Sequence, residues 1–324
     1  MSAAPILVTG GAGYVGSVLV RRLLSKGCRV RVVDRMLFGA RGLEELDYDA
    51  NLEILVRDLR DPRAHGEALD GIETVVHLAA IAGEAACALE ADVAVETNWI
   101  ATVALARRAR ASGARRLVLA STCDVYGEDR DETLTEDSPV KPSTLYAELG
   151  SHAEQGVLEL ADGSGFEAVV LRLGAVYGLS PRMRFDLAIN HFAQKAVREG
   201  EVSLSGGTRW RPFLHVEDAA RGIVMGIDGQ LPIRPARIFN LGDNLETYPL
   251  RNLKEELEAE VPGVRVTLLP EQEDHPAHRV CFDRIEREWG FRATRRIRDG
   301  IEEIVRAIRS GVIADPEDRR FHNA

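Results

Sequence analysis

The chain has 324 residues, of which 45% are hydrophobic and 28% are charged, the balance of an ordinary globular protein with one large domain and a smaller second lobe. Its net charge of −10 argues against a nucleic-acid partner and against attraction to anionic membranes. Cys28, Cys87, Cys123 and Cys281 lie far apart without metal-ligand spacing, so we expect reduced thiols and no metal. We find no targeting segment and no run of ~18 apolar residues, which favours a cytoplasmic protein without a membrane partner.

Short apolar runs alternate with amphipathic stretches through the first half of the chain. Strands are predicted at 5–9, 29–33, 52–56, 74–78, 116–121 and 168–173. Helices are predicted at 14–25, 62–69, 92–112 and 143–161. Continuous apolar strands separated by helices indicate a parallel sheet that is covered on both faces. The first half therefore predicts a doubly wound α/β domain over residues 1–175.

The second half of the chain is more irregular. It contains predicted helices at 185–199 and 217–227, a turn at Gly206–Gly207, strands at 238–241 and 264–269, and a charged C-terminal helix. We interpret residues 176–324 as mainly a smaller α/β substrate lobe with C-terminal helices. A strand near 237–241 is expected to return to the first domain.

A glycine-rich loop follows the first predicted strand and opens the first predicted helix. Its glycines, Gly10, Gly13 and Gly16, have the spacing G-x-x-G-x-x-G. Glycine at these positions permits a tight turn, a close approach of the backbone to a diphosphate, and close packing of helix on sheet. The helix N-terminus at Tyr14 and Val15 offers amide donors and a partial positive charge to phosphates. The loop therefore predicts a dinucleotide-binding domain of the Rossmann type.

An acidic residue follows the glycine loop at the expected interval. Asp34 closes the second strand eighteen residues after Gly16, where a carboxylate hydrogen-bonds ribose hydroxyls. A carboxylate there repels the extra phosphate of NADP, so we expect NAD, although Arg35 leaves room for NADP. Asp58 and Leu59 follow the third strand and are expected near the adenine. A solvated helix cap is the alternative interpretation of the charges in that segment.

Five further segments extend the pattern beyond the glycine loop. They are Val75–Ala80, Asn98, Ser121–Gly127, Pro142 with Tyr146, and Arg211–Asp218. Together with the T-G-G-A-G-Y-V-G loop they resemble the extended short-chain dehydrogenase/reductases that modify nucleotide sugars. The resemblance covers nearly the whole chain. It implies an NAD cofactor, with Leu78, Ala79, Ala80, Asn98 and Tyr146 beside it.

The resemblance also implies a mechanism. Members of the family move a hydride between the nicotinamide and the sugar ring, usually at C4. Tyr146 matches the acid/base tyrosine, and Thr122 matches the hydroxyl that bonds the same sugar oxygen. Asp124 holds a position that is threonine in many epimerases and an acid in some dehydratases and decarboxylases, so we expect an auxiliary acid/base.

The family's lysine, four residues after the tyrosine, is replaced by Gly150. The two positions lie one helical turn apart, so a lysine there serves tyrosine and ribose together. Tyrosine titrates near 10, and without a nearby cation it stays protonated at neutral pH. The charge of the oxidised nicotinamide, or an arginine such as Arg182 or Arg184, is a candidate substitute. An engineered change at 150 is an alternative, but Leu149, a second departure, favours natural divergence.

Residues of the second half are expected to contact the substrate. The resemblance implies contacts from Thr122, Cys123, Arg182, Arg184, Asn190 and Arg211. Arg211 matches an arginine that grips a phosphate, for which its planar fork is suited; a surface ion pair is the alternative. In the late segment 274–280 Pro276 replaces a second family arginine, and Arg279 remains. His275 and His278 are interpreted as surface or capping residues.

The helices at 92–112 and 143–161 carry apolar faces. Relatives pair these two helices with their copies in a four-helix bundle, so a homodimer is expected; simple burial against the sheet is the alternative.

Three functions stay open. The leading one is an NAD-dependent nucleotide-sugar epimerase or dehydratase. The second is a weakened or non-redox NAD-binding homologue with a structural, sensing or partner-binding role. The third is an enzyme that acts on a non-nucleotide hydroxy or keto substrate.

Overall fold

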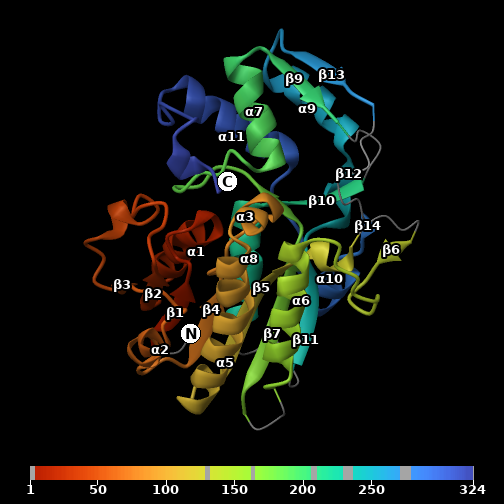
Figure 1. Cartoon of the computed structure of the whole chain (residues 1–324). Coiled ribbons are helices and arrows are strands. Elements are labelled where there is room, and N and C mark those ends of the chain that lie inside the picture. Colours follow the sequence, from red (N-terminus) through yellow and green to blue (C-terminus); the bar gives the residue numbers. More distant parts are fainter. Residues whose placement is uncertain are drawn as a thin grey trace.

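The computed structural model describes residues 4–127, 132–161, 165–205, 210–228, 236–270 and 279–323, and in these residues a seven-stranded sheet forms the centre of the larger lobe (Figure 1). Its strand order is β11-β7-β5-β4-β1-β2-β3, and every pairing is parallel. The strands are β1 (Ile6–Thr9), β2 (Val30–Asp34), β3 (Leu52–Val56), β4 (Thr74–His77), β5 (Arg116–Thr122), β7 (Glu167–Leu173) and β11 (Ala236–Leu241). All seven were predicted from the sequence to within two residues.

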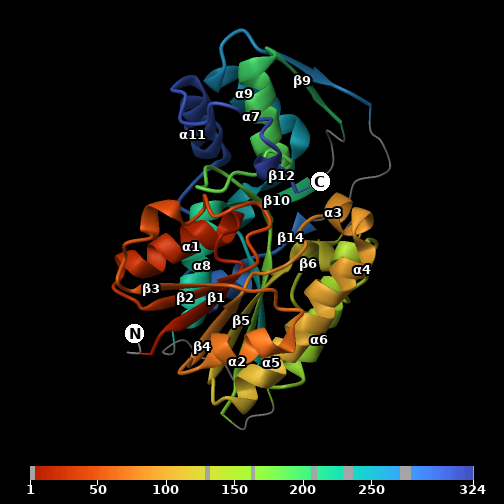
Figure 2. The same cartoon turned by 60° about the vertical axis from the view of Figure 1, so that its left-hand side comes forward.

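Helices cover both faces of this sheet (Figure 2). Along one face lie α1 (Tyr14–Ser25) and α8 (Val216–Ile227), which contact each other; along the other lie α2 (Pro62–Leu69), α5 (Thr102–Ala111) and α6 (Leu145–Leu158). Successive strand residues point to opposite faces, so Ile6 and Val8 pack with the α1 layer while Leu7 packs with the other. The Rossmann-type α/β fold expected from the sequence is confirmed.

The expected helix at 92–112 is wrong in one respect. The chain there forms α4 (Ala91–Ala94), a π-helical segment η2 (Val95–Ala101) and then α5, and a further helix α3 (Glu84–Leu89) precedes them. A π-helical turn shifts the side chains that follow it, and such turns are frequent at functional sites. The expected helix at 143–161 is α6, whose first turn is capped by the Thr144 hydroxyl, which accepts from Ala147 N at 3.3 Å.

The smaller lobe is built from segments after β7. Its helices are α7 (Ala188–Arg198), α9 (Leu253–Glu260) and α11 (Ile297–Arg309). Its strands are β8 (Ala175–Tyr177), β10 (Trp210–His215) and β12 (Thr247–Pro249) in one sheet, and β9 (Glu201–Leu204) with β13 (Arg265–Leu268) in another. A small pair, β6 (Thr133–Leu134) and β14 (Arg279–Val280), and helix α10 (Asp283–Trp289) lie beside the main sheet. The expected Gly206–Gly207 turn, His275, Pro276 and His278 lie outside the described residues.

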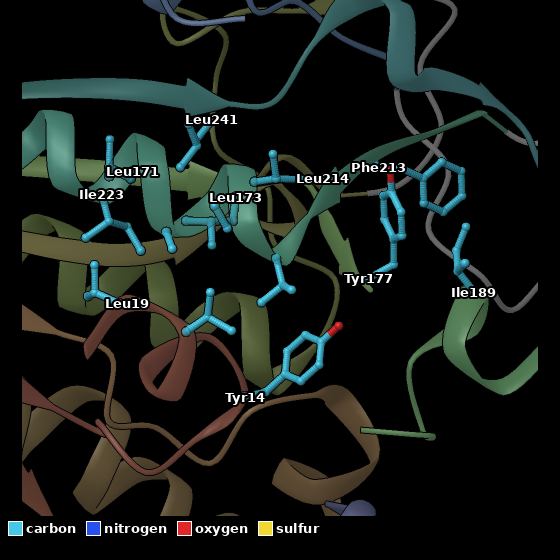
Figure 3. Packing of buried hydrophobic residues seen from close by; sticks show 14 of the residues in the cluster. Tyr14, Leu19, Leu171, Leu173, Tyr177, Ile189, Phe213, Leu214, Ile223 and Leu241 are labelled. Carbon is cyan, nitrogen blue, oxygen red and sulfur yellow. The ribbon is translucent and has the colours of Figure 1, made fainter. Parts of the chain in front are cut away.

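One hydrophobic cluster joins the two lobes. It runs from Leu19 and Ile223, under the main sheet, to Tyr177, Phe213 and Ile189 of the smaller lobe (Figure 3). Helix α8 and strand β11 belong to the sheet lobe although they follow residue 175, and the boundary predicted there remains a prediction. In the described ranges no helix combines the length and the apolar character needed to cross a membrane.

Candidate functional site

A cavity of about 690 Å³ lies between the lobes, at the carboxyl ends of the parallel strands. Ligands of open α/β sheets bind at this edge. The predicted site residues that line it are Gly10, Gly13, Tyr14, Val15, Gly16, Asp34, Arg35, Asp58, Leu59, Leu78, Ala79, Ala80, Thr122, Cys123, Asp124, Tyr146, Arg182, Arg184 and Arg211. The fold therefore gathers residues from both halves of the sequence around one space.

The glycine loop has the geometry of a diphosphate cradle. Gly10 has a φ of +70°, and a Cβ there would lie 2.8 Å from the Ala79 nitrogen. A Cβ at Gly16 would overlap the Gly10 carbonyl oxygen. Gly13 is the N-cap of α1 and supplies no side-chain cap, so the amides of the first turn are left for a ligand. This close backbone surface fits the diphosphate of a dinucleotide.

Asp34 ties the glycine loop to the end of β2. Its carboxylate accepts hydrogen bonds from the Ala12 nitrogen at 3.0 Å and the Met36 nitrogen at 2.8 Å. Burial raises the pKa of Asp34, while these amides act in the opposite direction. Asp34 also lines the cavity, so a structural role coexists with the expected contact to ribose.

The two aspartates after β3 have different roles: Asp58 lines the cavity and Asp61 caps a helix. Asp58 lines the cavity and pairs with Arg60 at 2.7 Å and with Arg35 at 3.9 Å, and Arg60 lowers the pKa of Asp58. The cap of α2 is instead Asp61, whose side chain accepts from the Arg63 nitrogen at 3.0 Å. The helix-cap interpretation therefore applies to Asp61 and not to Asp58.

Asn98 does not line the cavity, in contrast to the sequence-based expectation. From the π-helical segment it accepts from the Ile81 nitrogen at 2.7 Å and donates to the Ile81 carbonyl at 2.9 Å, which fixes the loop after β4. Beneath the same loop His77 bonds Thr9 and Thr102, each at 2.8 Å. Burial lowers the pKa of His77 to about 4, so the ring is neutral at pH 7. Asn98 and His77 hold the cavity floor in place.

The expected catalytic hydroxyl and acid lie together where β5 ends. The Thr122 hydroxyl donates to the Asp124 carboxylate at 3.0 Å and accepts from the Asp124 nitrogen at 3.1 Å. Cys123, between them, is fully buried, and its thiol donates to the Arg172 carbonyl at 3.3 Å. The thiol of Cys123 therefore points into the core, while the residue lines the cavity, and its expected contact with the substrate stays a prediction.

Tyr146 enters the same cavity from the first turn of α6. Burial, with a smaller contribution from the negative charge of Asp124, raises the pKa of Tyr146 to about 12. The positive charge of Arg184 acts in the opposite direction. Tyr146 is consequently protonated throughout the neutral range.

Gly150 faces the end of β5 one turn further along α6. A Cβ built there would lie 3.7 Å from Val125 Cγ1, 3.8 Å from Ser121 Oγ and 3.9 Å from Thr122 Cγ2, ordinary contact distances. The absence of a side chain at Gly150 is therefore not imposed by close packing around its Cβ position.

A buried ion pair that sequence reasoning missed lies on the next turn of α6. Glu154 bonds Arg172 of β7 at 2.6 Å, with both side chains almost fully buried, and it accepts from the Ser121 hydroxyl at 2.5 Å. His152 packs its ring on Trp99, with 4.7 Å between centroids, and so serves the helix packing.

The segment before α7 places two arginines at different parts of the cavity. Arg184 pairs with Asp186 and donates to the Ala82 carbonyl at 3.2 Å. Arg182 lies over the Phe38 ring, 4.0 Å from its centroid, and donates to Asn323 at 2.7 Å. Phe38 follows β2, so Arg182 lies on the side of Asp34, where the adenosine half of a dinucleotide is expected. Neither Phe38 nor Asn323 was identified from the sequence.

Asn190 is a structural residue here and does not line the cavity. It is fully buried, and its amide bonds the Gly178 nitrogen, the Tyr14 hydroxyl and the Arg184 carbonyl at 2.9–3.1 Å. The expected substrate contact of Asn190 is wrong because its polar atoms are used within the protein. Arg211, on β10, does line the cavity.

Comparison with known proteins identifies the family of this chain. A profile described as the NAD dependent epimerase/dehydratase family matches residues 6–242, and the chain belongs to this family. UDP-glucuronic acid decarboxylase 4 of Arabidopsis thaliana is 28% identical over 320 residues, which cover 96% of this chain and 70% of the relative. A dTDP-glucose 4,6-dehydratase of Streptomyces griseus is 32% identical over 319 residues, covering 93% and 92% of the two chains.

A solved structure shows the same architecture. The dTDP-glucose 4,6-dehydratase DesIV of Streptomyces venezuelae, determined with NAD bound, superposes with a TM-score of 0.84 at 27% identity, covering 98% of each chain. The family resemblance, the fold and the NAD cofactor expected from the sequence are thereby confirmed.

Proposed function

We propose that this protein is an NAD-dependent oxidoreductase of the epimerase or dehydratase type, acting at C4 of a nucleotide sugar. The observation that carries the proposal is the convergence of Thr122, Asp124 and Tyr146 on the cavity that the glycine loop also lines. Bound NAD supplies the hydride acceptor. The relatives act on UDP-glucuronic acid and dTDP-glucose, which supports a nucleoside-diphosphate sugar as the substrate class.

The protonation states suggest how these residues divide the proton transfers. Tyr146, with its pKa near 12, is ready to donate a proton to an oxygen of the substrate. Removal of a proton from the substrate needs an acceptor, and we assign this role to the Asp124 carboxylate. It accepts a hydrogen bond from the Thr122 hydroxyl at 3.0 Å, and this hydroxyl in turn is expected to contact the sugar oxygen. Thr122 thus both bonds the sugar oxygen and relays a proton to Asp124.

Arg184 is the protein cation that supports Tyr146 in place of the missing lysine. Its guanidinium lines the cavity, is held between Ala82 and Asp186, and lowers the pKa of Tyr146. Asp186 neutralises part of the charge of Arg184, and the burial of Tyr146 raises its pKa more than Arg184 lowers it. Tyr146 therefore still titrates far above neutral pH.

The test is turnover of UDP- and dTDP-sugars, with products identified by nuclear magnetic resonance and cofactor reduction followed by absorbance. Tyr146→Phe and Asp124→Asn should each lower kcat by at least about 100-fold, since each removes one proton-transfer group. Tyr48→Phe is the matched control, because Tyr48 is 99% exposed and remote from the cavity lining. Full activity in Tyr146→Phe and Asp124→Asn would contradict the assigned roles.

Gly150 and the raised pKa of Tyr146 also favour a second candidate, an NAD-binding homologue without redox activity. It predicts tight NAD binding and no cofactor reduction by any sugar of the panel. Calorimetric titration with UDP and dTDP tests the remaining alternative of a non-nucleotide substrate, which requires that neither nucleotide binds.

We propose further that the protein is a homodimer through the helices at 92–112 and 143–161. Trp99 and Ile100, on the π-helical segment beside α6, are 39% and 54% exposed, which leaves apolar surface on this face for a second copy. A monomer mass in light scattering at micromolar concentration would refute the dimer.

A further inference from the structure

Among the described residues, Arg182 is a buried guanidinium with no carboxylate at ion-pair distance, although the charges of Asp186 and Asp34 act on it from further away. The residue is only 3% exposed, and its guanidinium donates a hydrogen bond to the neutral amide of Asn323. The Nε atom is buried without a hydrogen-bond partner. Buried charges are normally paired, because removing an ion from water is costly. Burial lowers the pKa of Arg182 to about 10, so the group keeps its charge at neutral pH. The residue lines the cavity, where an anion can approach it.

The backbone that carries Arg182 is fastened to the first turn of α1. The Ser180 hydroxyl donates to the Tyr14 carbonyl at 2.7 Å and lies 3.1 Å from the Ser17 hydroxyl. The Tyr14 hydroxyl donates to the Gly178 carbonyl at 2.6 Å, and Figure 3 shows the Tyr14 ring directed from α1 towards the smaller lobe. Arg182 is therefore presented beside the helix end that receives a dinucleotide's phosphates.

We propose that Arg182 provides the counter-charge for the diphosphate of bound NAD, so that the smaller lobe takes part in holding the cofactor. Its side chain lies over Phe38 and lines the same cavity as Gly13 and Val15. The glycine loop supplies neutral amide donors, and Arg182 adds the full positive charge that they lack.

Two other phosphates fit the position of Arg182 less well. The diphosphate of a substrate nucleotide is expected on the side of Arg211, whereas Arg182 lies beside the segment after β2. The 2′-phosphate of NADP would approach Asp34, whose carboxylate repels it. NAD is the cofactor of the family, and this inference requires only NAD binding, not the proposed sugar chemistry.

Asn323 is the positioning residue for Arg182. Its carbonyl oxygen accepts from Arg182, and its amide donates to the Ala82 carbonyl at 2.9 Å. The Phe321 carbonyl accepts from the Phe185 nitrogen at 2.8 Å, which anchors the same C-terminal stretch between the lobes. Loss of Asn323 should therefore weaken NAD binding through Arg182.

The experiment compares Arg182→Met with the intact protein after removal of retained cofactor. Calorimetry should show that NAD affinity falls about 10- to 100-fold, the effect of one charge-assisted contact, while UDP affinity is unchanged. The cofactor-free variant should melt at the same temperature as the intact protein or higher, because an unmatched buried charge is removed. Asn323→Ala should show a smaller loss of NAD affinity.

Arg41→Met is the matched control, since Arg41 packs over Phe321 at 5.2 Å but does not line the cavity; its NAD affinity should be unchanged. Unchanged NAD affinity in Arg182→Met would overturn the proposal. So would a loss of UDP affinity alone, a greater loss for NADP than for NAD, or failure of the intact protein to bind NAD. A lower melting temperature of the cofactor-free Arg182→Met protein would also count against it.

Discussion

Restoring a cation at position 150 should shift the pH dependence of catalysis. A Cβ at Gly150 would lie 3.7–3.9 Å from its neighbours, so a lysine side chain can start there without a steric clash. Positions 146 and 150 share one face of α6, so the lysine would lie on the same side of the helix as Tyr146. At a separation of about 6 Å and an effective dielectric constant of about 20, the ammonium favours tyrosinate by about 3 kcal/mol, or about two pKa units.

The pKa of Tyr146 is about 12, so at pH 8 about one molecule in ten thousand carries tyrosinate. In Gly150→Lys this fraction should rise about 100-fold. Tyrosinate then becomes a second proton acceptor beside the Thr122–Asp124 pair, so kcat should rise by up to the same factor. The assay is the pH profile of kcat, together with tyrosinate absorbance.

The matched control is Gly150→Met, which has similar length and no charge. Both variants should gain about 1 kcal/mol of stability, because glycine is unfavourable within a helix. An equal change of kcat in Gly150→Lys and Gly150→Met would refute the electrostatic reasoning, as would an unshifted pH profile in the lysine variant.

Three further outcomes follow from local geometry. Gly16→Ala should abolish measurable NAD binding, because its Cβ would overlap the backbone of the loop; unchanged affinity by calorimetry would contradict this. Glu154→Ala should lower the free energy of unfolding in urea by about 3–5 kcal/mol, because Arg172 is left buried without its partner, whereas the exposed Glu159→Ala should change it little. Burial lowers the pKa of His77 from 6.5 to about 4. The neutral ring therefore makes its full contribution to the free energy of unfolding above pH 6.5, and this contribution is lost as the pH falls towards 4. Between pH 7.5 and 5 this residue should account for about 2 kcal/mol of lost stability, and His77→Gln should show a correspondingly smaller decrease; equal decreases would show that its protonation is not responsible.

The sheet and the cofactor loop were predictable because their determinants are local. Apolar strand segments, three glycines at fixed intervals and Asp34 at the end of β2 each depend on a few neighbouring residues. The same holds for Thr122 and Asp124, which occupy one turn, and for Tyr146 and Gly150, which occupy one helix face.

The remaining parts of the site depend on contacts between distant segments. Arg182 was expected at the substrate, and that contact stays a prediction. The structure places its guanidinium against Phe38 and Asn323, which lie far away in the sequence. Asn98 and Asn190 have side chains suited to ligand contacts, yet both are used to hold loops. A residue type shows what a side chain can bond, whereas tertiary packing decides which partner it meets.

Transfer of label from the sugar to the cofactor tests the proposed function most directly. The protein is incubated with UDP- and dTDP-sugars deuterated at C4, and the nicotinamide is examined by mass spectrometry after rapid denaturation. We predict deuterium in the reduced cofactor with at least one sugar, and a larger labelled fraction in Gly150→Lys. Bound NAD that stays unlabelled with every sugar, in both the intact protein and Gly150→Lys, would contradict hydride transfer at C4.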